Sequence, residues 1–302
     1  MLGLIVGIYT FIVNLIKLGL FAIIACFFSC VPFAFAAGIF TEIPGLSASA
    51  QSSLVAHYDG RTGVSTSNAT SSVDSWTPVD GNGNSLPSMV VSSTARGTGA
   101  ASLITYDGVG NLSFDDTATG SQGRYLLGAL TNDQSTSFTV MWRGHYKADA
   151  PFQTSGTYAY NIGINDISHQ RDDGGGGFRV ELYNGTTYAG DDITAYDGTD
   201  TIWSTVITAN SHNVYANGTN LNVGGNPSNS VGANADIIMG AYSGSGYDFV
   251  GDMSQMIIFN SALSDADRIL VGGYLTSIPE PSVTLLLGLG ILPLLMRRRR
   301  SR

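Results

Sequence analysis

The sequence predicts an all-β protein folded as a β-sandwich. Several segments alternate apolar and polar residues, which is the period-two pattern of strands with one buried face. Glycine, serine, threonine, asparagine and aspartate dominate the sequence around these segments, and long helical periodicities are missing. The ~235 residues from Ile43 to Ser277 can bury a sizeable core as one domain, or as two. Many strands and one late helix favour the sandwich.

The longest strand pattern runs from residue 138 to residue 146. It places Trp142 with other apolar side chains on one face and Arg143 with other polar side chains on the opposite face. Trp203 also lies inside a strand pattern, so we expect both tryptophans in the core. Further strands are predicted at 178–183, 201–209, 237–242 and 253–260.

Two local elements are also predicted. A hairpin spans residues 213–223, because its Asn217-Gly218 pair accepts the positive φ angles of a tight type I′ turn. One short helix follows Ser264, which can cap its N-terminus. This helix would carry Asp265 and Asp267 in its first turn, where acids are favourable, and Ile269, Leu270, Tyr274 and Leu275 on its apolar face.

The order of these segments resembles a known family. The opening consists of Leu-Val-Ala-His-Tyr-Asp at 54–59, Val-Asp-Ser-Trp at 73–76 and Asp-Gly-Asn-Gly-Asn at 80–84. Together with the strand from 137, the hairpin and the closing segment 251–268, it resembles laminin-G-like (concanavalin A-like) domains of bacterial surface proteins. Asp80 stands later after Trp76 than is usual in that family. The resemblance covers residues 50–276 and implies a jelly roll of two antiparallel sheets.

The C-terminal tail has the composition of a short membrane segment. An apolar run from Ser282 to Met296 is followed by Arg297, Arg298, Arg299, Arg300 and Arg302. As a helix the run would cover only ~22 Å, less than the ~30 Å hydrocarbon core of a bilayer. The arginines favour the cytoplasmic side, so the preceding domain is expected across the membrane.

The tripeptide Pro279-Glu280-Pro281 stands directly before this run. Residues 278–302 contain the tripeptide, the apolar run and the arginines. This segment resembles the PEP-CTERM sorting signal of Gram-negative and related bacteria. The resemblance implies that an exosortase, a membrane-embedded cysteine protease, reads the tripeptide, removes the tail and passes the protein to the cell surface or an exopolysaccharide matrix. A plain membrane anchor is the alternative, which explains the run and the arginines but not the tripeptide.

The N-terminus predicts export. Lys17 precedes an apolar run, and Ala34-Phe35-Ala36 has the small-x-small pattern that signal peptidase cleaves. We therefore expect a signal peptide at 1–36, a connecting segment at 37–49 and the sandwich from residue 50. A retained N-terminal anchor, or a true start nearer Lys17, is the alternative.

Both cysteines, Cys26 and Cys30, fall inside the leader. The exported domain is therefore expected to have no disulfide and no thiol chemistry. The residues before Cys26 loosely match a lipoprotein box, but the apolar sequence continues for another stretch beyond it. This continuation disfavours lipidation.

Charge excludes one class of partner. All 23 acids lie between Glu42 and Glu280, where eight of the 14 lysines and arginines also lie, so this part has a net charge of 8 − 23 = −15. Such a domain would repel nucleic acid.

The distribution of carboxylates disfavours catalysis. Retaining glycoside hydrolysis needs two carboxyl groups about 5.5 Å apart. The sequence has three glutamates, and only Glu181 lies in the domain, without an acidic partner at strand spacing. The four histidines, His57, His145, His169 and His212, lie far apart and lack zinc-ligand spacing. We predict a protein that is not an enzyme.

Paired acids are the candidate ligands for calcium, which prefers several carboxylate and carbonyl oxygens. The pairs are Asp115-Asp116, Asp172-Asp173 and Asp191-Asp192. None matches a known calcium loop, and a solvated acidic turn explains each pair as well. Calcium therefore stays an unassigned candidate, and no other cofactor is expected.

Loop aromatics are the candidate platforms for a sugar ring, whose apolar face stacks on aromatic side chains. The candidates are Trp76, Tyr188, Tyr196 and Tyr247. Packing against the rim of the sandwich is the alternative for each. We expect an exported surface or matrix protein that binds polysaccharide or another surface component. The alternatives are a glycan-processing enzyme and a structural matrix protein without a specific ligand.

Overall fold

The computed structural model describes residues 39–67, 72–92, 104–114, 125–130, 137–147, 157–162, 167–172, 179–183, 187–208, 211–223, 236–241 and 249–277. The chain divides into two compact units, Met1–Ala37 and Gly38–Arg302, and every described residue belongs to the second. The predicted leader with Ala34 and Ala36, and the tail from residue 278, lie outside the described residues.

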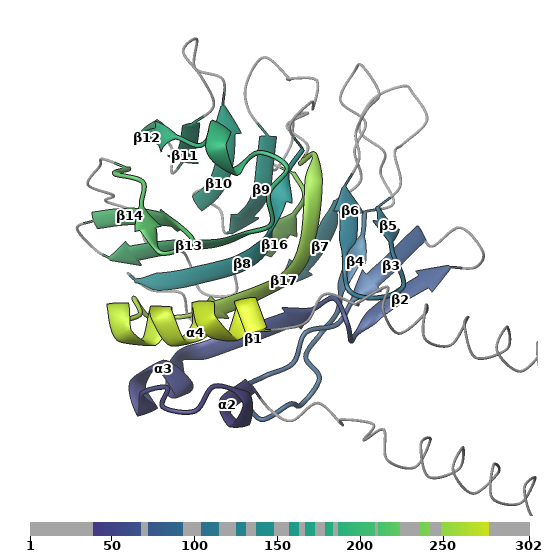
Figure 1. Cartoon of the computed structure of the whole chain (residues 1–302). Coiled ribbons are helices and arrows are strands. Elements are labelled where there is room, and N and C mark those ends of the chain that lie inside the picture. Colours follow the sequence, from purple (N-terminus) through teal and green to yellow (C-terminus); the bar gives the residue numbers. More distant parts are fainter. Residues whose placement is uncertain are drawn as a thin grey trace, which may run out of the picture. The chain divides into compact units, whose positions relative to one another are not determined.

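The fold consists of strands that pair antiparallel throughout the described residues. The pairings form one continuous network that bends into two layers (Figure 1). The predicted all-β, antiparallel class is therefore confirmed.

The first layer has the order β15-β14-β13-β8-β17, and the other edge of β17 pairs with β6 along its first part and β1 along its second. Its strands are β1 (Leu54–Asp59), β6 (Leu112–Phe114), β8 (Phe138–Tyr146), β13 (Thr201–Thr208), β14 (Ser211–Ala216), β15 (Thr219–Asn220) and β17 (Gly251–Phe259).

The second layer has the order β12-β11-β10-β9-β16-β7-β4-β3-β2. Its strands are β2 (Val64–Ser67), β3 (Ser72–Trp76), β4 (Met89–Val91), β7 (Leu126–Ala129), β9 (Thr157–Ile162), β10 (Ile167–Asp172), β11 (Arg179–Tyr183), β12 (Thr187–Asp192) and β16 (Asp236–Met239). A short strand, β5 (Thr105–Tyr106), pairs with β3 and β6 and so joins the two layers.

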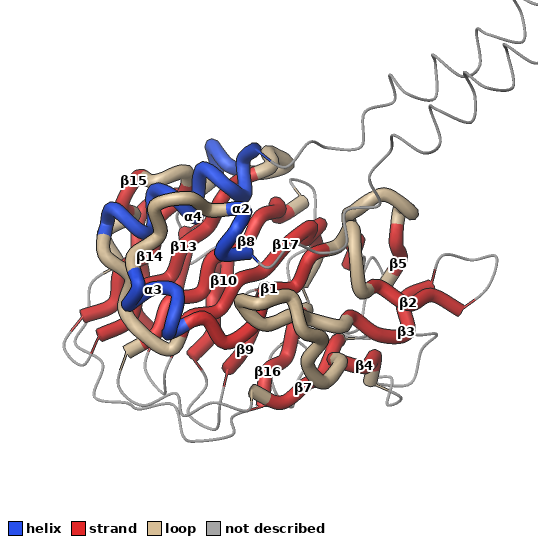
Figure 2. Tube along the Cα trace, turned by 90° about the horizontal axis from the view of Figure 1, so that it is seen from below, coloured by secondary structure: helices blue, strands red, loops and turns tan. Residues whose placement is uncertain are grey.

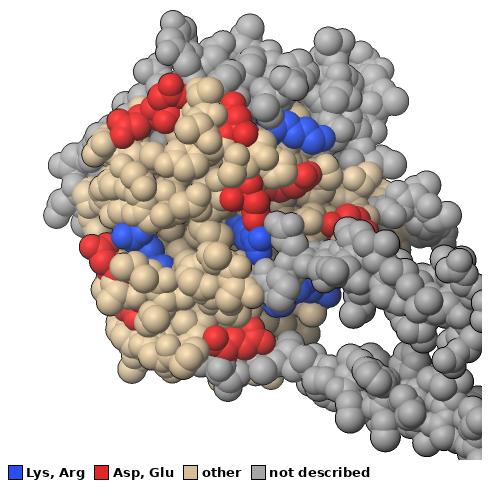
Figure 3. Space-filling view, viewed as in Figure 1, with Lys and Arg blue, Asp and Glu red and all other residues tan. Residues whose placement is uncertain are grey.

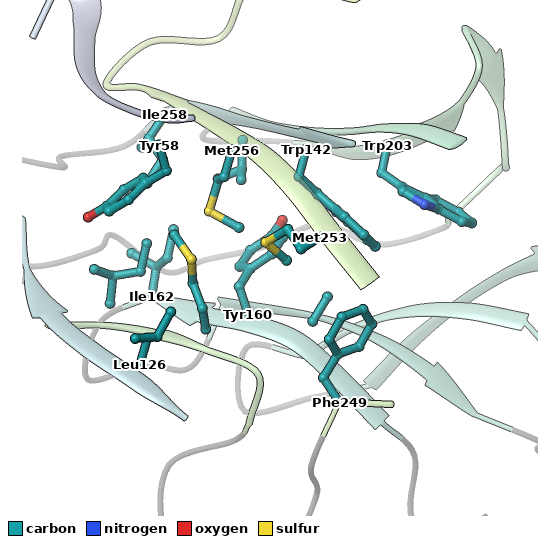
Figure 4. Close-up of a cluster of buried hydrophobic side chains, with 14 of the residues drawn as sticks. Tyr58, Leu126, Trp142, Tyr160, Ile162, Trp203, Phe249, Met253, Met256 and Ile258 are labelled. Carbon is teal, nitrogen blue, oxygen red and sulfur yellow. The ribbon is translucent and has the colours of Figure 1, made fainter. Parts of the chain in front are cut away.

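The main core fills the space between the layers. Figure 4 shows Tyr58, Met256 and Trp142 from the first layer facing Leu126 and Tyr160 from the second. Trp142 and Trp203 stand opposite each other on β8 and β13, with stacked rings whose centroids are 5.7 Å apart. Both are fully buried, as the strand pattern predicted.

Local predictions were good at turns and strands. Asn217 and Gly218 have φ angles of 47° and 84°, so the predicted turn between β14 and β15 is confirmed. The predicted strands appear as β8, β11, β13, β16 and β17, with ends that differ by one or two residues except at the C-terminal end of β16.

In the described part of the chain, three α-helices cover the outer face of the first layer (Figure 2). They are α2 (Ile39–Glu42), α3 (Ala48–Ser53) and α4 (Asp265–Ser277), and a short 3-10 helix, η2 (Thr194–Tyr196), lies elsewhere. Among the described residues, no helix is long and apolar enough to cross a membrane.

The segment expected to connect leader and domain belongs to the fold. Ile43 and Leu46 are buried beside Val271 and Leu275 of α4, and together they form a second apolar cluster on the first layer. A connecting segment from residue 39 would therefore be hard to remove without exposing apolar surface.

The helix α4 begins as predicted but turns a different face inward. Ser264 Oγ accepts from the backbone N–H of Asp267 at 3.1 Å, which confirms the cap. Tyr274 and Leu275 are buried, whereas Ile269 is 66% exposed and Leu270 36% exposed. The predicted apolar face is therefore wrong for these two residues.

Candidate functional site

The outer face of the second layer carries no described α-helix. A row of directly paired residues crosses it, with Val90 opposite Leu127, Leu127 opposite Ile238, and Ile238 opposite Asn161. Val90 is 53% exposed and Leu127 37% exposed, whereas Ile238 is 8% and Asn161 2% exposed, so the accessible part of the row lies on β4 and β7. Because all three described α-helices pack on the first layer, this face is the candidate surface for a ligand.

Trp76 does not line any surface. It is fully buried in the main core, with its ring edge against Tyr58 at a centroid distance of 5.5 Å. Its indole Nε1 donates to the carbonyl oxygen of Asp59 at 3.1 Å, which satisfies its one polar atom. The prediction of Trp76 as a sugar platform is therefore wrong.

Tyr196 packs at the rim. It ends η2 and is half-buried, and its ring meets Trp203 edge-on at a centroid distance of 5.7 Å. This contact matches the alternative of packing against the sandwich. The side chain of Tyr188 and the whole of Tyr247 lie outside the described part of the chain, so their role as platforms stays a prediction.

A five-residue loop, Asp-Gly-x-Gly-Asn, occurs twice, at 80–84 and at 107–111. Asp80 Oδ1 accepts from the backbone N–H of Asn84 at 2.8 Å, and Asp107 Oδ1 accepts from that of Asn111 at 3.0 Å. In each loop the asparagine side chain also donates to the second carboxylate oxygen, at 2.9 and 2.8 Å. Only the first copy belongs to the predicted opening of the domain, although the repeated five-residue pattern is visible in the sequence at both places.

These loop carboxylates serve the turns that contain them. For both Asp80 and Asp107, partial burial alone would raise the pKa, but the hydrogen bonds from the loop outweigh it and the pKa is lowered. Their oxygens therefore already have donors. Among the described residues, no group of three or more histidine, cysteine, aspartate or glutamate side chains is placed to hold a metal ion.

The acid pairs offer little more to calcium. Asp191 Oδ2 accepts from Asn222 Nδ2 at 2.7 Å, and Asp192 Oδ1 accepts from the backbone N–H of Thr194 at 2.8 Å. Asp192 thus stabilises a turn, as the alternative interpretation expected, whereas Asp191 bonds to a residue 31 positions later in the chain. Asp115, Asp116, Asp173 and the side chain of Asp172 lie outside the described residues.

The second loop is seated against the end of β1. A side chain at Gly60 would overlap the carbonyl oxygen of Gly110, so only glycine allows this close approach. Next to it, Arg61 Nη2 lies 2.6 Å from Asp59 Oδ2, and Arg61 Nε donates to Asp59 Oδ1 at 3.0 Å. This charged pair links the last residue of β1 to the turn that follows it.

Ionisable side chains also gather beneath α4. The hydroxyl of Tyr274 donates to Glu42 Oε2 at 2.6 Å, and its ring meets His57 edge-on at 5.8 Å. Burial lowers the pKa of His57, although neighbouring Asp59 favours its charged form. Burial and the bond to Glu42 raise the pKa of Tyr274 above its ordinary value.

This cluster lies around a buried histidine. His57 is 4% exposed and Gln255, its neighbour on β17, is 1% exposed. Its clear effect is to join the chain's two described ends, because Glu42 precedes the sandwich and Tyr274 follows it.

Charges on the visible face are dispersed. Figure 3 shows acidic side chains in several separate places with basic ones between them, and broad uncharged areas elsewhere. No single acidic patch on that face points to one cationic partner.

Comparisons with known proteins give only distant likenesses. The sequence matches no protein-family model and no curated protein. One similar solved structure is domain 4 of a GH43 extracellular arabinanase from Geobacillus stearothermophilus, in complex with arabinotriose, at 19% identity and a TM-score of 0.42, covering 71% of this chain and 96% of that one.

Two others are longer proteins. Trypanosoma rangeli sialidase in complex with sialic acid matches at 11% identity and a TM-score of 0.41, over 76% of this chain and 34% of that one. The binding domain of botulinum neurotoxin serotype D matches at 13% identity and a TM-score of 0.48, over 74% and 52%. This chain thus spans about a third and about half of their lengths, and likenesses this weak carry no argument about ligand or activity.

Proposed function

We propose that the protein is exported to the bacterial cell surface or an exopolysaccharide matrix, where it presents a concanavalin A-like jelly roll that binds carbohydrate or another surface component. Signal peptidase would remove the leader after Ala36. An exosortase would then process the chain at Pro279-Glu280-Pro281. The protein would act without catalysis.

The position of the domain's ends carries this proposal. The last element, α4, ends at Ser277, two residues before Pro279, so the tail follows the fold directly. Glu42 lies six residues beyond the expected leader cleavage site and bonds to Tyr274. The contacts between the first and last described segments of the domain thus form before the tripeptide. This arrangement is compatible with removal of the tail.

The accessible part of the second layer's outer face, on β4 and β7, is the proposed binding surface. Its exposed row of Val90 and Leu127 supplies an apolar strip on a rigid sheet, against which a sugar face can pack. The absence of catalysis is supported by the lone domain glutamate and by the burial of His57.

Substitution of the tripeptide tests the sorting step. In the native host, Glu280→Ala should leave the unprocessed, heavier form in the membrane fraction, because the protease would no longer read its signal. Ser282→Ala is the matched control, as it changes a neighbouring polar residue outside the tripeptide. Immunoblots of membrane and surface fractions give the readout. An unchanged ratio of processed to unprocessed protein in the Glu280→Ala strain would contradict the sorting hypothesis.

A polysaccharide panel tests binding. The exported protein should bind at least one polysaccharide, and Leu127→Glu should reduce that affinity tenfold or more, about 1.4 kcal/mol, by placing a charge on the binding face. Ile269→Glu is the matched control, since Ile269 is an exposed apolar residue on the opposite layer. Equal affinity for both variants would argue against this face. Binding lost in EDTA would indicate calcium, and turnover of a glycan would overturn the non-enzymatic assignment.

A further inference from the structure

The outward face of α4 carries two adjacent exposed apolar side chains, between the exposed Asp265 at its start and the polar Thr276 and Ser277 at its end. Ile269 and Leu270 are its exposed apolar side chains, at 66% and 36% exposure. From Ile269 to Ser277 the helix contains no charged residue, and its charged side chains are all near its start, at Asp265, Asp267 and Arg268. Figure 3 shows the surface over α4 as largely uncharged, in a domain that is otherwise rich in acids.

Contacts with the sheet fix the rotation of α4 about its own axis, so that this face points outward. The guanidinium of Arg268 lies 3.6 Å from the ring centroid of Tyr215, a cation–π contact with β14. At the other end, Arg143 Nη1 donates to the carbonyl oxygen of Leu275 at 3.1 Å. With Tyr274 bound to Glu42 as well, the orientation of Ile269 and Leu270 toward the outside is set by contacts on three sides.

The sequence places this face close to the apolar tail. Only five steps along the chain separate Ser277 from Ser282, where the apolar run begins, and five extended residues reach at most ~17 Å. The headgroup region on each side of the hydrocarbon core is about 5–8 Å thick. A tail inserted in a bilayer would therefore keep the end of α4 within about 17 Å of the hydrocarbon core. Ile269 and Leu270 lie about two turns before that end, so they can reach the headgroup region if the helix lies along the membrane surface.

We propose that Ile269 and Leu270 dock into the headgroup–acyl boundary of the phospholipid bilayer that holds the uncleaved tail, with the second layer turned away from it. The inference rests on the proposed insertion of the tail. Two apolar side chains bind a membrane only weakly without a tether. Removal of the tail would therefore also release Ile269 and Leu270 from the bilayer. The net charge of −15 between Glu42 and Glu280 opposes anionic lipid, so zwitterionic bilayers would be preferred.

A site-specific dye tests this orientation. The exported precursor without its leader, residues 37–302, contains no cysteine and receives one at a time, Ile269→Cys or the control Val90→Cys, which is 53% exposed on the second layer. An environment-sensitive dye on each is followed in phosphatidylcholine vesicles with and without a quencher-labelled lipid. We expect blue-shifted, quenched emission at position 269 and neither effect at position 90. Phosphatidylglycerol at low salt should weaken the quenching, and added salt should restore it.

Flotation of the same vesicles separates the two hypotheses. If deletion of residues 282–302 abolishes flotation, the tail inserts in the bilayer. If the dye at position 269 is then as unquenched as the dye at position 90, the docking alone is overturned. Flotation that does not depend on residues 282–302 would overturn tail insertion and the docking together.

Discussion

At the scale of the residue, Asp80 and Asp107 each hold a loop together with one carboxylate. The carboxylate accepts backbone N–H groups through one oxygen and an asparagine side chain through the other. Hydrogen bonds to the charged form lower the pKa of both groups despite partial burial. Each loop is thus stable because its aspartate is ionised.

A folded-state pKa below the unfolded value has a definite effect on stability. The stabilisation from Asp107 is complete above the unfolded pKa near 3.9 and is lost as the pH falls through the lower, folded pKa. We expect Asp107→Asn to lower the free energy of unfolding by roughly 0.5 kcal/mol at neutral pH, because the amide keeps an accepting oxygen but loses the charge that strengthens the hydrogen bonds in this exposed loop, and by less below pH ~3.5. Urea unfolding across this pH range measures it. A loss that stays constant with pH would show that the carboxylate's charge is not the cause.

For Trp76, the sequence did not predict the burial of the side chain. Polar neighbours on both sides suggested a loop position, yet β3 turns Val73 and Trp76 inward and its intervening residues outward. The partner of its indole is the carbonyl oxygen of Asp59, 17 residues earlier in the chain. Trp142 was predictable because its own strand is long enough to show which face is apolar.

At the scale of the element, the short helices α2 and α3 fasten the start of the domain to α4. Ser47 donates from its backbone N–H to Asp267 Oδ1 at 2.9 Å and from its hydroxyl to Asp267 Oδ2 at 2.9 Å. Glu42 accepts from Tyr274. No helical period reveals four- and six-residue helices in sequence, so this segment was predicted only as a connection.

Removal of this segment should destabilise the sandwich. Compared with a fragment of residues 37–277, a fragment of residues 50–277 loses the buried side chains of Ile43 and Leu46, each of which contributes about 1.5–3 kcal/mol of burial. We expect the midpoint of thermal unfolding to fall by several degrees, as followed by circular dichroism. Truncation at residue 39 is the matched control, since it leaves both residues in place. Equal midpoints for the 37–277 and 50–277 fragments would contradict this role.

At the scale of the whole molecule, contacts within residues 39–277 hold the last helix of the domain in place. The end of α4 is capped from within, because Arg143 donates to the carbonyl oxygen of Leu275 and the Ser277 hydroxyl donates to that of Tyr274 at 2.8 Å. The helical layer joins the first and last described elements on one face of the first layer. A domain of this design can keep its fold through cleavage after Ser277.

Deletion of Pro279–Arg302 should therefore leave the stability of the domain unchanged. We expect the shortened protein to unfold at the same temperature as the full chain in detergent, within about 1 °C, because the contacts that hold α4 lie within the domain. Arg143→Ala in the shortened protein is a positive control and should lower the midpoint, since it leaves the carbonyl oxygen of Leu275 without this donor. A clear loss of stability on deletion alone would show that the tail contributes to the fold.

The sequence by itself determined the all-β class, the Asn217-Gly218 turn, the cap at Ser264 and the burial of Trp142 and Trp203. Each depends on residues within one element or one turn, where period and local hydrogen bonding decide. Only the tertiary structure decided the burial of Trp76, the inward face of α4 and the bond between Glu42 and Tyr274. These depend on partners far apart in the chain, 232 residues in the last case, whose meeting is set by how the two layers and the helices pack.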